Sequence, residues 1–276
     1  MFSRFQHPTL PAAIPPLVFT LSLLSAGCSL PALAQSDLTQ YRELLADGNP
    51  AELWEARGAE LWDKADGPKK VSLRGCDLGK GPGVVAGAYV ELPRYFADAG
   101  KVMDLEQRLL YCRTTLQGLT PEQARAQHFG AAGKPSVMEA LAAYVAGQSR
   151  GMKMAVSTAH PQELRAYKTG EYLFHYRAGS HDFACVSCHG QDGRRIRLQE
   201  LPNILNPQQA QAAYTSWPAY RVSQGEVRSM QHRLSDCLRQ QRFPQVEYGS
   251  DTITALTMFL AKNANGGTFA APAIKR

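Results

Sequence analysis

The sequence lacks several features that would assign it to whole classes of protein. It has no run of five or more Lys or Arg residues, although its formal net charge is +6, so a nucleic-acid-binding tail is not indicated. Beyond residue 34, no segment is apolar enough to form a transmembrane helix. Charged residues make up only 20% and hydrophobic residues 44% of the chain. A folded globular protein is therefore expected, and a disordered one is not.

Residues 1–34 are typical of a secretory signal. Arg4 supplies the positive start, residues 14–24 form an apolar core that is short for a membrane span, and residues 32–34 read Ala-Leu-Ala, a cleavage site. The mature chain is expected to begin near Gln35, in the periplasm. Its net charge would then be +6 − 1 = +5. A lipoprotein cleavage box ending at Cys28 is the alternative, with a lipid anchor on that cysteine.

Cysteine is also scarce, since the chain has six and signal cleavage removes one of them. Cys185 to His189 reads C-x-x-C-H, the attachment motif of haem c. The spacing lets two thiols bind the two vinyl groups of one haem while the adjoining imidazole ligates the iron. A chance match or a redox dithiol are the competing interpretations, and haem attachment by Cys185, Cys188 and His189 is favoured.

Cys76 and Cys112 remain in an oxidising compartment, where a disulfide is the expected state. A second haem is the competing interpretation. Residues 76–80 read Cys-Asp-Leu-Gly-Lys and therefore lack both the second cysteine and the histidine. The disulfide is favoured, and one covalent haem is expected in the chain.

Cys237 is then the one unpaired thiol. An odd cysteine in an exported protein indicates either an intermolecular link or a functional group. A small buried hydrophobic residue is the plain alternative.

The chain contains a weak internal repeat. Arg108 to Cys112 parallels Arg233 to Cys237, and residues 137–146 parallel residues 252–261. The repeat predicts a mainly α fold with two tandem cytochrome c-like domains, the first degenerate and haem-free. The expected divisions are a signal at 1–34, a haem-free domain at 35–152 and a haem-binding domain at 153–276.

Helix dominates the expected secondary structure, and one short pair of strands is expected in the Gly-, Val- and Tyr-containing stretch 70–95. The predicted helices are 38–46, 50–64, 103–117, 121–127, 135–147, 161–177, 207–214, 217–223, 225–241 and 250–263.

The sixth iron position needs a ligand from between the haem motif and the terminal helix. The candidates are Met230, His232, Cys237 and, less well placed, Met258. Methionine would raise the redox potential, as a plain electron carrier requires. A thiolate would lower it, which suits chemistry at sulfur. The residues alone leave this choice open.

Arginines surround Cys237 in the sequence, and their field is expected to favour the thiolate and to attract an oxyanion. Arg233 lies one turn before the thiol on the predicted helix and is the favoured anion-binding residue. A solvated helix face is the alternative, especially for the later arginines. The set comprises Arg221, Arg228, Arg233, Arg239 and Arg242.

Residues 185–189 and 223–237, Ser-Gln-Gly-Glu-Val-Arg-Ser-Met-Gln-His-Arg-Leu-Ser-Asp-Cys, together resemble SoxA, the cytochrome subunit of the SoxAX complex of thiosulfate oxidation. The resemblance implies an L-cysteine S-thiosulfotransferase of the single-haem type. It implies that Cys185 and Cys188 carry the haem and that His189 and Cys237 ligate its iron. Cys237 would also be the catalytic residue, a persulfide in that family, and Arg233 the substrate-binding residue.

The resemblance further implies the partners. They are a SoxX-like cytochrome c subunit in a heterodimer, the SoxYZ carrier protein whose cysteine accepts thiosulfate, and a cytochrome c electron acceptor. A Cys76–Cys112 disulfide is also implied. The alternative function is a periplasmic monohaem cytochrome c that uses Met230 and only carries electrons.

Overall fold

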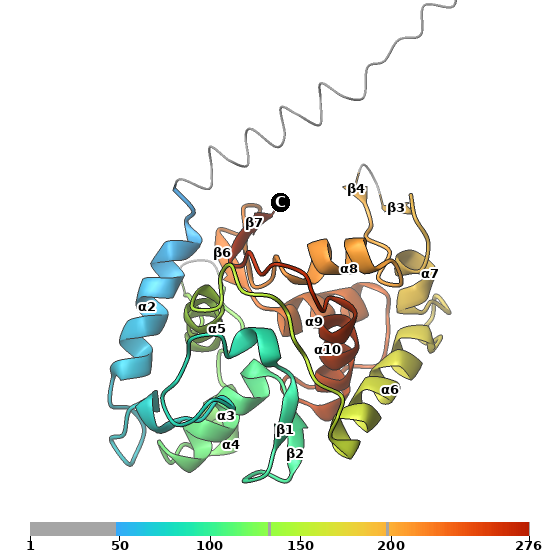
Figure 1. Ribbon diagram of the computed structural model, residues 1–276. Coiled ribbons are helices and arrows are strands. Elements are labelled where there is room, and N and C mark those ends of the chain that lie inside the picture. The colour runs from blue at the N-terminus through green and yellow to red at the C-terminus, as the bar shows by residue number, and fades with distance from the viewer. Residues whose placement is uncertain (1–47, 132–133, 197–198, 276) are drawn as a thin grey trace, which may run out of the picture. The chain divides into compact units, whose positions relative to one another are not determined.

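A computed structural model describes residues 48–131, 134–196 and 199–275. Within these ranges the chain is mainly helical, as the sequence predicts, and the short strand pairs lie toward the edges of the helical body (Figure 1). The helices are α2 (Ala51–Asp63), α3 (Leu105–Thr115), α4 (Pro121–Arg125), α5 (Val137–Gly147), α6 (Pro161–His175), α7 (Cys185–His189), α8 (Pro207–Tyr214), α9 (Met230–Gln240) and α10 (Asp251–Asn263).

The strands are two or three residues long and form three small sheets. All pairs are antiparallel except that of β5 with β7. The pairs are β1 (Arg94–Phe96) with β2 (Lys101–Met103), β3 (Arg195–Ile196) with β4 (Gln199–Glu200), and β5 (Ala219–Arg221) with both β6 (Glu226–Arg228) and β7 (Ala273–Lys275).

The repeat seen in the sequence is also a repeat of local structure. Hairpin β1–β2 leads into α3 through Asp104, whose side chain accepts a hydrogen bond from the Gln107 amide at 2.8 Å. Hairpin β5–β6 leads into α9 through Ser229, whose side chain accepts one from the His232 amide at 3.1 Å. In both halves an N-cap satisfies a free amide and fixes where the helix begins.

A glycine at a helix crossing occurs in each half. A Cβ atom on Gly58 of α2 would collide with the Ala140 carbonyl and the Tyr144 Cβ of α5. A Cβ atom on Gly170 of α6 would collide with the Ala255 carbonyl and the Phe259 Cβ of α10. Ala140 and Ala255 occupy the same position of the sequence repeat, so the two crossings are equivalent.

One hydrophobic core serves both halves. Leu105 and Met138 of the first half lie in the same buried cluster as Met230 and Met258 of the second. Beside it is a buried polar junction. Gln231 Nε2 donates to Asp104 Oδ2 at 2.7 Å, and the Tyr248 hydroxyl donates to Glu106 Oε1 at 2.9 Å. The described part of the second half therefore packs directly against the first.

Three secondary-structure predictions were wrong. The predicted helix 217–223 contains β5, and the first residues of the predicted helix 225–241 form β6, because a hairpin precedes α9. Residues 70–95 contain short 3₁₀ turns, Leu73–Gly75 and Tyr89–Glu91, while the hairpin of this half lies at 94–103. Helix 38–46, the signal 1–34 and Cys28 lie outside the described residues.

Candidate haem and thiol site

The C-x-x-C-H motif forms the short helix α7. The Ala184 amide donates to Ser187 Oγ at 3.0 Å, which closes the turn at the start of the helix. One helical turn places Cys185 and Cys188 three residues apart with His189 directly after them. All three side chains are half-buried, so a large planar group has access to them.

The His189 ring is held by a backbone carbonyl. Its Nδ1 atom donates to the Pro202 carbonyl oxygen at 2.9 Å. Burial lowers the pKa of this imidazole, and the nearby Arg233 charge lowers it further. A neutral imidazole with Nδ1 already bonded has its Nε2 lone pair free for a metal.

The wall beside α7 is apolar. Phe174, Ile204, Leu256 and Phe259 form a buried cluster. Half-buried groups that pack on this cluster include Leu173, Cys185, Val186 and Leu234. The two thiols, the free imidazole nitrogen and this wall fit a covalently bound haem c.

No group of three or more His, Cys, Asp or Glu side chains is placed to hold a metal ion in the parts of the chain that the structure describes. The iron of a haem, which the porphyrin already binds, would need few ligands from the chain itself.

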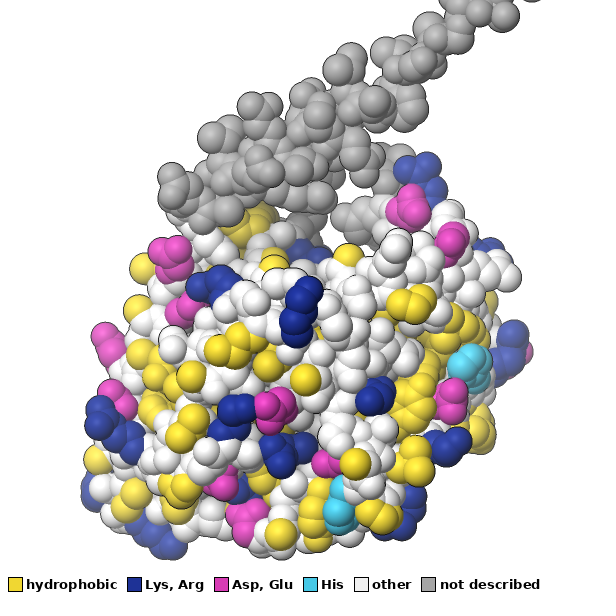
Figure 2. Space-filling view, in the orientation of Figure 1, with side chains coloured by type: hydrophobic (Ala, Val, Ile, Leu, Met, Phe, Trp, Pro, Cys, Tyr) yellow, Lys and Arg dark blue, Asp and Glu magenta, His cyan; other side chains and the backbone are white. Residues whose placement is uncertain are grey.

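The surface around α6 and α7 exposes apolar side chains. Figure 2 shows hydrophobic groups gathered at the edge where these helices lie, whereas charges of both signs are interspersed over the rest of the visible face. Leu164, Tyr172, Tyr176 and Phe183 are exposed large hydrophobic residues of this region. The haem motif therefore lies beside an apolar rim.

Helix α9 places Cys237 near the haem motif. The thiol is free and half-buried. Burial raises the pKa of Cys185 to about 12, and the charge of Cys237 is the next cause, so the two sulfurs lie within electrostatic reach. The charge of Cys188 likewise raises the pKa of the Cys237 thiol.

The expectation that arginines favour the Cys237 thiolate is confirmed for the charge of Arg233, which lowers the pKa of the thiol, but this charge does not decide the net shift. Burial raises the pKa of this thiol above its ordinary value, and Arg233 opposes that shift without overcoming it. Desolvation disfavours a thiolate more than one half-exposed guanidinium favours it. The protein alone thus keeps Cys237 protonated, and a metal would have to stabilise the thiolate.

The other candidate ligands lie in different surroundings. Met230 and Met258 are buried in the large core that both halves share. His232 packs edge-on against Phe129 with ring centroids 4.6 Å apart, and burial lowers its pKa to about 4. Of the two candidates that titrate, Cys237 has a haem-motif cysteine among the causes of its pKa shift, whereas the causes for His232 are burial, arginines and Asp236.

The arginines that surround Cys237 in the sequence do not all surround it in space. Arg228 is buried and donates from Nη1 to Glu139 Oε2 at 3.0 Å and to the Gly130 carbonyl at 2.8 Å. It therefore joins the two halves. Arg239 is exposed and donates to Asp236 Oδ1 at 2.6 Å. Arg233 approaches Asp236 only at 3.8 Å.

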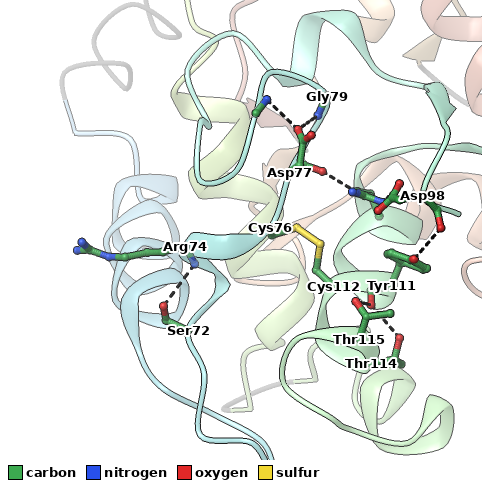
Figure 3. The surroundings of a disulfide bond; sticks show 12 residues. Ser72, Arg74, Cys76, Asp77, Gly79, Asp98, Tyr111, Cys112, Thr114 and Thr115 are labelled. Carbon is green, nitrogen blue, oxygen red and sulfur yellow. Dashed lines mark hydrogen bonds and ion pairs between the residues drawn. A yellow bond between two sulfur atoms is a disulfide. The ribbon is translucent and has the colours of Figure 1, made fainter.

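Cys76 and Cys112 form a disulfide, with Cα atoms 5.6 Å apart (Figure 3). The loop after Cys76 is ordered by Asp77, whose Oδ1 accepts from the Gly79 and Gly81 amides at 2.6 and 2.9 Å. This segment stands in the first half where α7 stands in the second.

Sequence reasoning missed two parts of the site. The Pro202 carbonyl that orients His189 carries no side-chain signal, because any residue offers a carbonyl. The Asp236–Arg239 pair could have been found, since an i, i+3 spacing places opposite charges on one helix face.

Fold and site together define a double cytochrome c in which the second half carries the haem-attachment motif and the first half is closed by a disulfide. A family model, the SoxA/TsdA cytochrome c domain, matches residues 57–154 and 169–269. These two segments correspond to the two halves described above.

Known proteins with similar sequences cover nearly the whole chain. The L-cysteine S-thiosulfotransferase subunit SoxA of Hydrogenophilus thermoluteolus is 45% identical over 267 residues, 94% of this chain and 97% of that protein. A subunit of the same name from Hydrogenobacter thermophilus is 32% identical over 91% and 94% of the two chains.

A solved structure agrees with both relatives. The crystal structure of SoxXA from P. pantotrophus aligns with a TM-score of 0.67 at 26% identity, over 83% of this chain and 79% of that chain. The chain therefore belongs to the SoxA family of cytochromes c, and that family implies covalently bound haem c. No helix among the described residues is long and apolar enough to cross a membrane.

Proposed function

We propose that this chain conjugates thiosulfate oxidatively to a cysteine of a SoxYZ-type carrier protein in the periplasm. It would act with a SoxX-type cytochrome c subunit and a cytochrome c electron acceptor. The similar proteins, L-cysteine S-thiosulfotransferase subunits and a SoxXA complex, support the activity and the partner. The family's covalent haem supports the electron route.

The proposed reaction balances as two steps at Cys237. In the first, the Cys237 thiolate and the sulfane sulfur of thiosulfate form a sulfur–sulfur bond and release two electrons. In the second, the carrier cysteine thiolate attacks the sulfane sulfur and displaces the Cys237 thiolate. The net change joins a carrier thiol to thiosulfate with loss of one proton and two electrons. Bound haem would accept these two electrons one at a time, and each would pass on to the cytochrome c acceptor.

The side chains of this chain position the reactants. Cys185 and Cys188 would hold the haem, and His189 and Cys237 would ligate its iron. Arg233 would bind the sulfonate oxygens through its planar fork of N–H donors. It lies one turn before Cys237 on α9, so a bound sulfonate would hold the sulfane sulfur near the thiol.

The observation that carries this proposal is the position of Cys237. It lies within electrostatic reach of both haem-motif cysteines, whereas Met230 and Met258 are in the shared core. An electron carrier that uses methionine as its ligand would require Met230 to leave that core.

Replacing Cys237 by Met in the haem-loaded heterodimer tests the proposal. The variant should fold and keep its covalent haem but lose conjugating activity by a factor of about 10³ or more, because the nucleophile is absent. Met230→Leu is the matched control on the same helix and should keep its activity. Ferric electron paramagnetic resonance should show a thiolate-ligated low-spin signal in the wild type and in Met230→Leu alone. Activity retained by Cys237→Met would refute the proposal, as would a wild-type His/Met signal, which indicates a simple electron carrier.

A further inference from the structure

The peptide group between Pro202 and Asn203 links His189 to the side chain of Gln209. Its carbonyl oxygen accepts from His189 Nδ1 at 2.9 Å, and its N–H, which belongs to Asn203, donates to Gln209 Oε1 at 2.8 Å. Because a peptide group is planar, a partner on its N–H also fixes the direction of its carbonyl. The Gln209 side chain therefore helps to hold the acceptor that orients the His189 ring.

Gln209 is itself held by a carboxylate. Its Nε2 atom donates to Asp192 Oδ1 at 3.0 Å, and the same oxygen accepts from Asn203 Nδ2 at 2.8 Å. From the ring outward every bond runs in the same direction, since His189 donates to the peptide group, the peptide group to Gln209, and Gln209 to Asp192. Hydrogen-bonded groups in series polarise one another, and here a negative charge stands at the accepting end.

Local structure places Gln209 at the start of α8. The Asn206 side chain accepts from the Gln208 and Gln209 amides at 3.1 and 3.5 Å, which fixes the first turn of this helix. The loop is closed at a second point, because the Ile204 amide donates to the His189 carbonyl at 2.8 Å. Gln209 is half-buried, whereas its neighbour Gln208 is exposed.

We propose that Gln209 and Asp192 are positioning residues for His189, the proposed iron ligand, which they join to a carboxylate through two amide groups. Their role goes beyond the function proposed above and rests on the haem c that the family implies, not on the conjugation of thiosulfate. A hydrogen bond from the second nitrogen of a metal-bound imidazole fixes the ring and raises its basicity. A more basic ligand stabilises ferric relative to ferrous iron, so this series of bonds should lower the midpoint potential.

Redox titration of the purified, haem-loaded protein tests this assignment without turnover. Gln209→Ala removes the middle of the series without a change of charge. It should shift the equilibrium about threefold to tenfold toward ferrous iron, where tenfold corresponds to about 59 mV for a one-electron couple. Gln208→Ala is the matched control on the same helix and should leave the midpoint potential unchanged. Proton NMR of the reduced protein should also show faster solvent exchange of the His189 Nδ1 proton in Gln209→Ala alone.

A double-substitution cycle tests the part of Asp192. Asp192→Asn keeps an accepting oxygen but removes the charge, so it should raise the midpoint potential of the otherwise unchanged protein. It should have a smaller effect in the Gln209→Ala background, because the series that connects the carboxylate to His189 is then broken. An equal effect in both backgrounds would overturn the assignment of Asp192, since its charge would then act through space.

An unchanged midpoint potential and unchanged exchange of the Nδ1 proton in Gln209→Ala, with normal haem content, would overturn the proposal and leave Gln209 as a loop contact alone. If Gln209→Ala does not fold, Gln209→Met, which keeps the side-chain length without the amide, decides the matter by the same titration. No thiosulfate enters these measurements. A protein that shows the shift in potential but conjugates nothing would refute the proposed function and keep the positioning role.

Discussion

Helices α3 and α9 carry the same arginine–cysteine spacing behind equivalent hairpins, yet their side chains have different surroundings. In α3, Cys112 is buried in a disulfide. Arg108 is 4% exposed and donates to the Asp77 carbonyl at 2.7 Å and to Asp98 at 2.9 Å. In α9, Cys237 is a free thiol and the Arg233 side chain is 38% exposed. In the first half the cysteine and the arginine are both bonded within the protein, whereas in the second half the thiol is free and the guanidinium is partly exposed.

The difference shows how one scaffold can serve stability or chemistry. The cation of Arg108 also lies over the Phe96 ring, 4.1 Å from its centroid. Nε and Nη1 of Arg108 are therefore both engaged within the protein, whereas Arg233 has only its 3.8 Å contact with Asp236 among the described residues. Four sets of substitutions test this difference between the two halves and the way in which they are joined.

Removing the disulfide should have the largest effect on stability. Cys76→Ala/Cys112→Ala frees a loop with a sequence separation of 36 residues, so the free energy of unfolding should fall by about 3–4 kcal/mol in the chain-entropy description. Urea unfolding measures this loss, and reduction of the wild type should reproduce it. Conjugating activity at low temperature should persist. Loss of activity in the folded double variant would show that the first half has a direct catalytic role.

Filling the two helix crossings should have nearly as large an effect. Gly58→Ala and Gly170→Ala each place a methyl group against a backbone carbonyl of the facing helix, so each should cost about 3 kcal/mol. Thermal unfolding measures both, and Gly48→Ala, whose Cβ would meet nothing within 4 Å, controls for glycine replacement. Unequal costs at Gly58 and Gly170 would show that the two crossings are not equivalent.

Replacing the two equivalent arginines, Arg108 and Arg233, should separate an effect on stability from an effect on substrate binding. Arg108→Gln should lower the free energy of unfolding by about 2 kcal/mol, since it leaves the Asp77 carbonyl without its donor. Arg233→Gln should change that free energy by less than about 0.5 kcal/mol and raise the KM for thiosulfate instead. Denaturant unfolding and steady-state kinetics on both variants provide the test. A stability loss in Arg233→Gln equal to that in Arg108→Gln would erase the contrast.

The junction between the halves should make stability depend on pH. Burial, followed by the charge of Asp104, raises the pKa of Glu106 to about 8. The folded state then retains a proton that the unfolded chain releases above about 4.5. Stability should therefore fall by about 1 kcal/mol for each pH unit between pH 5 and 8 and level off above that.

Glu106→Gln should flatten this dependence, which denaturant unfolding at several pH values would measure. The exposed Glu60→Gln should leave the slope unchanged. A slope that survives in Glu106→Gln would place the titrating group elsewhere.

Much of the fold follows from sequence because periodic segments and the repeat mark the helices. The hairpin before α9 was missed because residues 225–229 continue the polar pattern of the helix, and only tertiary pairing with β5 and β7 makes them a strand. The sign of the Cys237 pKa shift was also out of reach. Burial decided it, whereas the sequence displays only the neighbouring charges.

The local motifs were readable because covalent chemistry fixes their spacing. The partner of Arg228 was not readable, because Glu139 lies about ninety positions away in the sequence. Arg239, by contrast, pairs with Asp236 within one helical turn. The assignments of Cys237 as ligand and Arg233 as substrate-binding residue remain predictions, as does the boundary between the domains near residue 152.

The buried contact between Glu139 and Arg228 has a consequence for the history of the molecule. A shortened gene encoding the haem-bearing half alone would deprive the Arg228 guanidinium of both Glu139 and the Gly130 carbonyl and would expose its side of the junction to water. The half without a haem motif can therefore not be removed by simple deletion without loss of contacts in the half that remains.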